Sequence, residues 1–248
     1  MQDADPTIDV ALQRHRPRWR AYLLLSRVSN LPTVWSNVLA GLVAGSALAD
    51  PSTRPATVAL LMLAASAFYT GGMFLNDAFD APFDRRARPE RPLPRGEVGL
   101  TEAFVVGGAL LALGLVLVSS NRSALMPGIG LAAAVVFYDA RHKGSAVAPL
   151  VMGACRGLVY VMAAATGVLS SAAWAGAGVM LVYVAGLTVV AKRAGANARW
   201  LIPALIAGIS IVDAVFILVV NPSSVSLAVM AALGCPLTLA LQRWVPGD

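Results

Sequence analysis

The sequence predicts an all-α protein that spans a membrane as a polytopic bundle of about eight helices. Of its 248 residues, 58% are hydrophobic and only 13% are charged, which is uncommon in a soluble domain of this size. Apolar runs of about 17–22 residues recur along the chain, and such a run is long enough to cross a hydrocarbon core of about 30 Å. Basic residues gather in alternate loops between these runs, as in polytopic membrane proteins.

Each predicted helix is an apolar run bounded by polar or turn-forming residues. The first run follows Trp19 and Tyr22, two aromatic residues that suit a membrane interface, and it contains Pro32. The second run ends in an acidic stretch. The predicted helices cover residues 23–49, 56–79, 100–119, 124–138, 147–169, 174–190, 200–220 and 224–244.

The loops at one end of the predicted bundle carry most of the 19 Lys and Arg residues. These loops are 80–99, 139–145 and 191–199. The opposite loops contain only Arg54 and Arg122. The positive-inside rule therefore predicts that both termini are cytoplasmic, with residues 1–20 as a polar basic tail of a single domain, 1–248.

The charge and composition also indicate the surroundings of the protein. The net charge of +6 is sorted by loop, so it indicates a lipid bilayer and not a nucleic acid as the partner. Richness in Ala, Val, Arg and Gly suggests a bacterial chain, which predicts a multi-pass protein of the bacterial inner membrane.

Four side chains with oxygen donors lie close together at the end of the second predicted helix. They are Asn76, Asp77, Asp80 and Asp84. In a helix, Asn76, Asp80 and Asp84 follow i, i+4, i+8 spacing, and Pro82 leaves open whether Asp84 belongs to the helix or to the loop. Mg²⁺ prefers oxygen ligands and usually shares its shell with substrate phosphates, so these four residues are candidate metal ligands. The alternative is a capped helix end, which uses one or two such residues and not four.

A basic loop follows these side chains directly. Its arginines are Arg85, Arg86, Arg88, Arg91 and Arg95. Guanidinium groups bind phosphate oxygens in a bidentate way, and the interspersed prolines disfavour a helix here. For any single arginine, a role in membrane topology is an equal alternative. The pairing of carboxylates with arginines is more specific, because a metal–diphosphate needs both.

The segment Asn76-Asp77-x-x-Asp80-x-x-x-Asp84, followed by Arg88-Pro89-x-Arg91-Pro92-Leu93-Pro94, resembles the first aspartate motif of the UbiA-type intramembrane prenyltransferases. Two weaker motifs agree with this resemblance. Arg27-x-x-x-x-Pro32 resembles the opening motif of the family, and Tyr138-x-x-x-His142-Lys143 resembles its Y-x-x-x-K-R loop. The resemblance extends over most of the chain in helix order.

This resemblance implies helices around a central cavity and an enzyme that binds Mg²⁺ and an isoprenoid diphosphate donor. It implies that Asn76, Asp77, Asp80 and Asp84 bind the metal, and that Asp80 and Asp84 act in catalysis. The basic residues that it implies as diphosphate contacts are Arg27, Arg88, Arg91 and Lys143, and Lys192 and Arg193 are further candidates because of their charge.

The chain departs from the family pattern in two places. The family usually carries a second Asp-rich motif after the sixth helix, whereas residues 188–197 contain no carboxylate. Either Lys192 and Arg193 replace the second metal by direct charge, or the second site is lost. The chain is most similar to a UbiA-like subgroup with a reduced second motif, found in bacterial secondary-metabolite operons. Many relatives also have nine helices, where eight are predicted here.

Two further charged residues lie deep inside predicted helices, Arg156 in the fifth and Asp213 in the seventh. A charge at this depth is costly unless it is paired or hydrated. One interpretation is that the two residues pair and hold the bundle together. The other is catalytic: Arg156 faces phosphate in the cavity, and Asp213 faces the acceptor as a base. Tyr160 lies one turn after Arg156, on the same face.

We therefore expect an Mg²⁺-dependent intramembrane transferase that moves a prenyl group from an allylic isoprenoid diphosphate to a small acceptor. One alternative is a UbiA-like terpene cyclase, which needs no acceptor. Another is a non-catalytic polyprenyl-phosphate binder or transporter. A transporter would place polar residues at midplane in paired halves, whereas the polar cluster here is predicted at the cytoplasmic interface.

Overall fold

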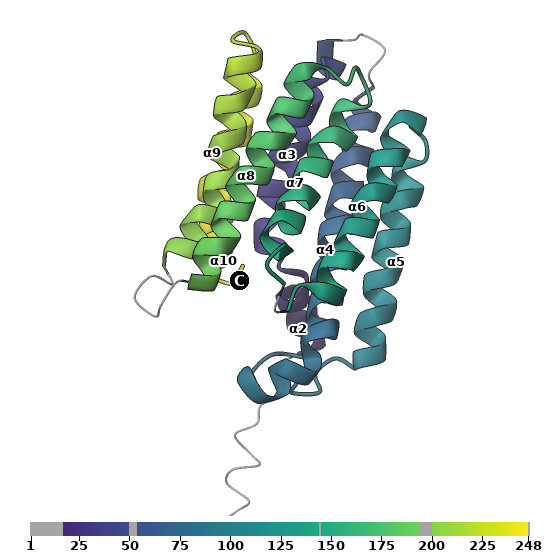
Figure 1. Cartoon of the computed structure of the whole chain (residues 1–248), viewed down its shortest axis with the longest axis vertical. Helices are drawn as coiled ribbons and strands as arrows, with labels where there is room; N and C mark the ends of the chain where they lie inside the picture. Colours follow the sequence, from purple (N-terminus) through teal and green to yellow (C-terminus); the bar gives the residue numbers. More distant parts are fainter. Residues whose placement is uncertain (1–16, 50–53, 144, 194–199, 248) are drawn as a thin grey trace, which may run out of the picture.

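The computed structural model describes residues 17–49, 54–143, 145–193 and 200–247, which form nine α-helices and two short 3-10 helices (Figure 1). The α-helices are α2 (Arg18–Ser26), α3 (Leu31–Ala44), α4 (Pro55–Ala87), α5 (Leu100–Val118), α6 (Arg122–Arg141), α7 (Ala148–Ala164), α8 (Ser171–Arg193), α9 (Leu201–Val220) and α10 (Val225–Gln242). The 3-10 helices are η1 (Val28–Asn30) and η2 (Ala47–Ala49).

The helices form a bundle suited to a bilayer, which confirms the predicted fold class. Six of them, α4, α5, α6, α8, α9 and α10, are long and apolar enough to cross a membrane. Large apolar side chains on their outer faces stay exposed, among them Val116 (67%), Met126 (70%) and Val219 (74%). Such a surface is stable against lipid and not against water. Helices α3 and α7 have 14 and 17 residues and are the most buried.

The first predicted helix, 23–49, is not continuous, which is why the described ranges contain nine α-helices and not eight. It breaks at Arg27, whose φ and ψ of 45° and 45° lie in the left-handed region. This conformation is unfavourable for a residue with a Cβ. Pro32 then lies in the first turn of α3, where the missing backbone N–H leaves no hydrogen bond unmade.

The second predicted helix continues eight residues beyond its predicted end at residue 79. Helix α4 passes through Pro82 and ends after Ala87, where the N–H of Arg88 donates to the carbonyl oxygen of Asp84 over 2.8 Å. A proline in a membrane helix removes one hydrogen bond without ending the helix when its neighbours are well packed. Here Asp80, Ala81 and Asp84 are all buried. The four candidate metal ligands Asn76, Asp77, Asp80 and Asp84 therefore all belong to α4.

Glycines bring α7 close to two of its neighbours, α3 and α8. A Cβ added to Gly45, after α3, would lie 2.3 Å from the carbonyl oxygen of Ala164. A Cβ added to Gly153 of α7 would lie 2.3 Å from the carbonyl oxygen of Leu181 in α8. Small residues at such positions let helix backbones approach, and van der Waals contact then holds the helices together.

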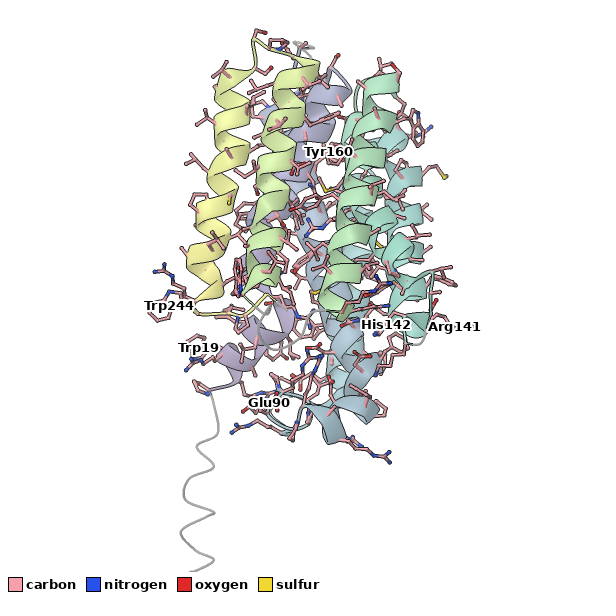
Figure 2. All side chains as sticks on the ribbon, turned by 60° about the vertical axis from the view of Figure 1, so that its left-hand side comes forward. Trp19, Glu90, Arg141, His142, Tyr160 and Trp244 are labelled. Atoms are coloured by element: carbon pink, nitrogen blue, oxygen red, sulfur yellow. The ribbon has the colours of Figure 1, made fainter. Side chains whose placement is uncertain are left out.

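One end of the bundle gathers the basic segments. Helix α2 and the C-terminal ends of α4, α6 and α8 lie together at the lower end in Figure 1. Figure 2 shows Trp19, Glu90, His142 and Trp244 at this same end. Trp19 and Trp244 are 64% and 78% exposed, as suits anchors in the interfacial region of a membrane.

The glycine contacts predict a specific pattern of stability. Gly153→Ala should lower stability by about 1–3 kcal/mol, because its methyl group meets a backbone oxygen that cannot rotate away. Gly178→Ala, on the open face of α8, has nothing within 4 Å of the new Cβ and is the matched control. Melting temperatures in detergent measure both, and equal melting temperatures would contradict the proposed close contact.

Candidate active site

The acidic side chains of α4 occupy one face of its last turns. At about 100° per residue, Asn76, Asp80, Asp84 and Asp77 fall in this order on an arc of about 100°. Asp77, Asp80 and Asp84 are 6%, 7% and 1% exposed. Since a buried carboxylate is stable only when it is paired or hydrogen-bonded, each of the three has a basic neighbour.

Arg91 joins two of these carboxylates. Its Nη1 lies 3.2 Å from Asp77 Oδ1 and 2.9 Å from Asp84 Oδ2. The loop after α4 folds back to place Arg91 there, through backbone hydrogen bonds from Arg91 to Arg88 and from Arg95 to Arg91. Arg27 Nη2 lies 3.2 Å from the same Asp77 oxygen. The left-handed turn at Arg27 thus brings the end of α2 against α4.

Asp80 is paired from the other side, by the end of α6. Lys143 Nζ lies 2.8 Å from Asp80 Oδ1, and its ammonium group lies 4.5 Å from the centre of the Phe83 ring. His142 Nε2 lies 3.4 Å from the same oxygen. The hydrogen bond to Asp80 raises the pKa of His142, so more of the imidazole is protonated near neutral pH.

A further carboxylate, Asp139, lies beside the predicted residues, and sequence reasoning missed it. Asn76 Nδ2 donates to Asp139 Oδ1 over 3.2 Å. Asp139 is 4% exposed and lines the cavity described below. The available signal was a carboxylate that follows an apolar run directly, at the same end of the bundle as the acidic stretch.

A largely apolar cavity of about 190 Å³ extends inward from this end. Its walls come mainly from α4, α6, α7 and α8, with side chains such as Phe68, Leu131 and Val159. Three charged residues line it, namely Arg27, Asp139 and Arg156. The walls thus suit a hydrocarbon chain, with charged groups at separate points for a polar head.

Arg156 belongs to a deeper polar layer. Its guanidinium group donates to Asn37 Oδ1 over 3.0 Å and to Thr33 Oγ1 over 3.1 Å, and it lies 5.4 Å from the centre of the Tyr69 ring. Tyr69 precedes Asp77 by eight residues of α4, so this layer lies about 12 Å deeper by helical rise.

Asp213 lies behind this layer and not in the cavity wall. It is fully buried and accepts hydrogen bonds from Ser36 Oγ (2.6 Å), Asn37 Nδ2 (2.8 Å) and the hydroxyl of Tyr160. Arg156 and Asp213 are linked through Asn37, which bonds to both. Figure 2 shows Tyr160 well inside the bundle, far above His142.

Three predicted diphosphate contacts lie apart from this site. Arg88 is exposed at the end of α4, and Lys192 and Arg193 are exposed at the end of α8. None of the three lines the cavity or joins an ion pair among the described residues. Residues 194–197, the rest of the position of the missing second motif, lie outside the described ranges. The structure therefore gathers Arg27, Arg91 and Lys143 around the carboxylates.

The oxygen donors fit a divalent cation that arrives with a diphosphate. In the described ranges, no three His, Cys, Asp or Glu side chains are placed to hold a metal ion by themselves. Mg²⁺ needs only one or two carboxylates when substrate phosphates supply the other ligands. Asp84 Oδ1 and Asp139 Oδ2 are buried and have no hydrogen-bond partner among the described residues, so both can accept a cation.

Residues 38–246 match the UbiA prenyltransferase family. The chain belongs to this family. Among curated relatives, a digeranylgeranylglyceryl phosphate synthase of Ignicoccus hospitalis is 43% identical over 95 residues, which are 38% of this chain and 29% of the relative. The synthase of Methanoregula boonei is 36% identical over 129 residues, 51% of this chain and 44% of the relative. The matches thus span less than half of these relatives.

Solved structures of UbiA proteins share the fold. A digeranylgeranylglyceryl phosphate synthase superposes with a TM-score of 0.62 at 21% identity, covering 90% of this chain and 96% of the other. A UbiA homologue from Archaeoglobus fulgidus bound to GPP and Mg²⁺ gives 0.56 at 18% identity, covering 90% and 86%. The family predicted from the aspartate motif is therefore confirmed, and so is its helical fold.

Arg91 pairs with both Asp77 and Asp84, so its replacement should have a large effect on stability. Arg91→Met should cost about 3 kcal/mol, because it leaves two buried carboxylates without their common partner. Arg88→Met, three residues earlier and exposed, should change stability by less than about 0.5 kcal/mol. Melting temperatures in detergent without divalent cations test this pair, and equal values would show that Arg91 contributes nothing to the fold.

Proposed function

We propose that this UbiA-family protein transfers a prenyl group from an allylic isoprenoid diphosphate to a small acceptor, and that the transfer depends on Mg²⁺. The observation that carries the proposal is the arrangement at the basic end. Buried carboxylates alternate there with Arg27, Arg91 and Lys143, and Arg27 and Asp139 also line the adjoining apolar cavity. A donor with a diphosphate head and a hydrocarbon tail matches both halves of this site.

The basic residues bind and orient the diphosphate. Arg27 lines the cavity, so its guanidinium group can reach a phosphate while it remains beside Asp77. Arg91 and Lys143 approach from the loop after α4 and from the end of α6. Charge-assisted hydrogen bonds from these groups become stronger as negative charge collects on the leaving diphosphate, which favours ionisation of the allylic C–O bond.

Asn76, Asp77, Asp80 and Asp84 would hold Mg²⁺ at this end of the bundle, and the bound metal would act as a Lewis acid on the diphosphate oxygens.

The apolar walls of the cavity would protect the reaction from water. They exclude water from the allylic cation formed on ionisation, so that the acceptor and not water captures it. Phe68, Leu131 and Val159 provide such walls.

Arg156 supplies a second cationic group deeper in the cavity. It suits an anionic substituent of a substrate, since its contacts with Thr33 and Asn37 leave other N–H groups unused. The relatives named digeranylgeranylglyceryl phosphate synthases are named for a phosphate-bearing product. An acceptor with a phosphate or another anion is consistent with this feature.

Asp213 would act as a positioning residue, because Asn37 separates it from Arg156 and it lies outside the cavity wall. The basic end would face the cytoplasm with both termini, as the positive-inside rule predicts. A bacterial inner membrane remains the proposed location on the composition of the chain.

Release of diphosphate tests the proposed function. Purified protein with geranyl, farnesyl or geranylgeranyl diphosphate and Mg²⁺ should release it, and chelation with EDTA should abolish release. Asp80→Asn and Asp84→Asn should each lower kcat by about a hundredfold or more, because each removes a carboxylate that would hold the metal against the leaving diphosphate. Glu102→Gln, which removes a carboxylate paired with Arg18 outside the cavity, is the control. No release from the unmodified protein with any donor would refute the proposal.

The role of Asp213 can be separated from base catalysis. As a positioning residue, Asp213→Asn should lower the melting temperature and lower kcat only modestly, by about tenfold, with an unchanged pH profile. Loss of a general base would instead remove one limb of the pH–rate profile. A flattened profile in Asp213→Asn, with an unchanged melting temperature, would contradict the positioning role.

A further inference from the structure

The second acidic motif that the resemblance to the UbiA family implies is absent from this chain. Residues 188–197 contain no carboxylate. Thr188 lines the cavity, but Lys192 and Arg193 at the end of α8 are exposed and outside its lining. A diphosphate that binds a second divalent cation in this protein therefore needs a carboxylate from another helix.

Asp139 of α6 is such a carboxylate. Its side chain lines the cavity and is 4% exposed, and Oδ1 accepts the hydrogen bond from Asn76 Nδ2. Oδ2 is buried without a partner among the described residues. Leaving such an oxygen without a hydrogen bond or a cation is unfavourable, so its retention in a cavity wall points to a ligand.

The ion pairs at the mouth set Asp139 apart from the acids of α4. Asp77, Asp80 and Asp84 each contact Arg27, Arg91 or Lys143. In the described ranges, no Arg, Lys or His side chain forms an ion pair with Asp139. His142 contacts only its backbone oxygen, through Nδ1 over 3.2 Å, while Nε2 faces Asp80. Asp139 is therefore the buried acid of this site that has no basic partner among the described residues.

We propose that Asp139 is a ligand of a second divalent cation that binds together with the donor diphosphate. Asp139 Oδ2 would supply the protein ligand, and phosphate oxygens and water the others. The hydrogen bond from Asn76 Nδ2 holds Asp139 Oδ1 and leaves Oδ2 for the cation. This inference rests on the proposed function, because the diphosphate completes the shell.

Metal stoichiometry tests the assignment without turnover. Mn²⁺ replaces Mg²⁺ and is counted by electron paramagnetic resonance in the presence of geranyl S-thiolodiphosphate, a donor that does not ionise readily. The unmodified protein should bind two Mn²⁺ per chain, and Asp139→Asn should bind one, or bind the second about tenfold more weakly. Glu97→Gln removes another buried carboxylate at the same end, paired with Arg95 outside the cavity wall, and should keep both ions.

A thiolate at the same position gives an independent readout. Asp139→Cys should bind Cd²⁺ with a sulfur-to-metal absorption band that depends on the diphosphate analogue, because thiolates prefer soft cations. The unmodified protein corrects for Cys155 and Cys235, and Glu97→Cys is the matched control. A residue that only supports the fold would give no such band.

The outcomes separate the two proposals. One Mn²⁺ in the unmodified protein, or two bound with unchanged affinity in Asp139→Asn, would overturn the role of Asp139, and neither result affects diphosphate release by the unmodified protein. Absence of release together with absence of Mn²⁺ binding would overturn both. Two ions in the unmodified protein, one in Asp139→Asn and a diphosphate-dependent Cd²⁺ band in Asp139→Cys would support the assignment.

Discussion

Burial of several carboxylates at one end of a membrane bundle constrains most of the structure around them. Asp77, Asp80 and Asp84 are less than a tenth exposed, and an unpaired charge in such a place is strongly destabilising. The loop after α4 must therefore return to bring Arg91 against α4, and α6 must end where Lys143 reaches Asp80. The break at Arg27 follows from the same constraint, since a continuous first helix would lack the turn that brings its guanidinium group to Asp77.

A second, deeper set of polar contacts fixes the relative positions of α3, α7 and α9. Thr33, Ser36 and Asn37 form a polar stripe on α3, at spacings of three and four residues. Through this stripe α3 bonds to Arg156 of α7 and to Asp213 of α9. Hydrogen bonds between helices restrict their relative positions in lipid, where no hydrophobic effect drives helices together. Helix α3 thus links α7 and α9, which follow it in the chain by more than a hundred residues.

The fold and the family could be predicted from the sequence because their signals are local. Apolar runs, basic loops and the spacing of Asn76, Asp80 and Asp84 need no knowledge of tertiary contacts. The continuation of α4 through Pro82 and the left-handed turn at Arg27 both depend on buried partners distant in the chain, so helix boundaries at these points were wrong. Asp139 was missed for a related reason. A lone carboxylate after an apolar run has no spacing pattern, and only packing shows that it faces Asn76.

The ion pairs also explain why the basic residues alone would bind a diphosphate poorly. Arg27, Arg91 and Lys143 are engaged with carboxylates, and four buried carboxylates face these three permanent cations. A diphosphate would add negative charge to a site whose cations are already paired with carboxylates. Divalent cations on the carboxylates would reverse this balance and release the guanidinium and ammonium groups to contact phosphate. The arrangement therefore favours joint binding of metal and diphosphate over binding of either one alone. The number of divalent cations bound with the diphosphate would then depend on the number of carboxylates at this end of the bundle.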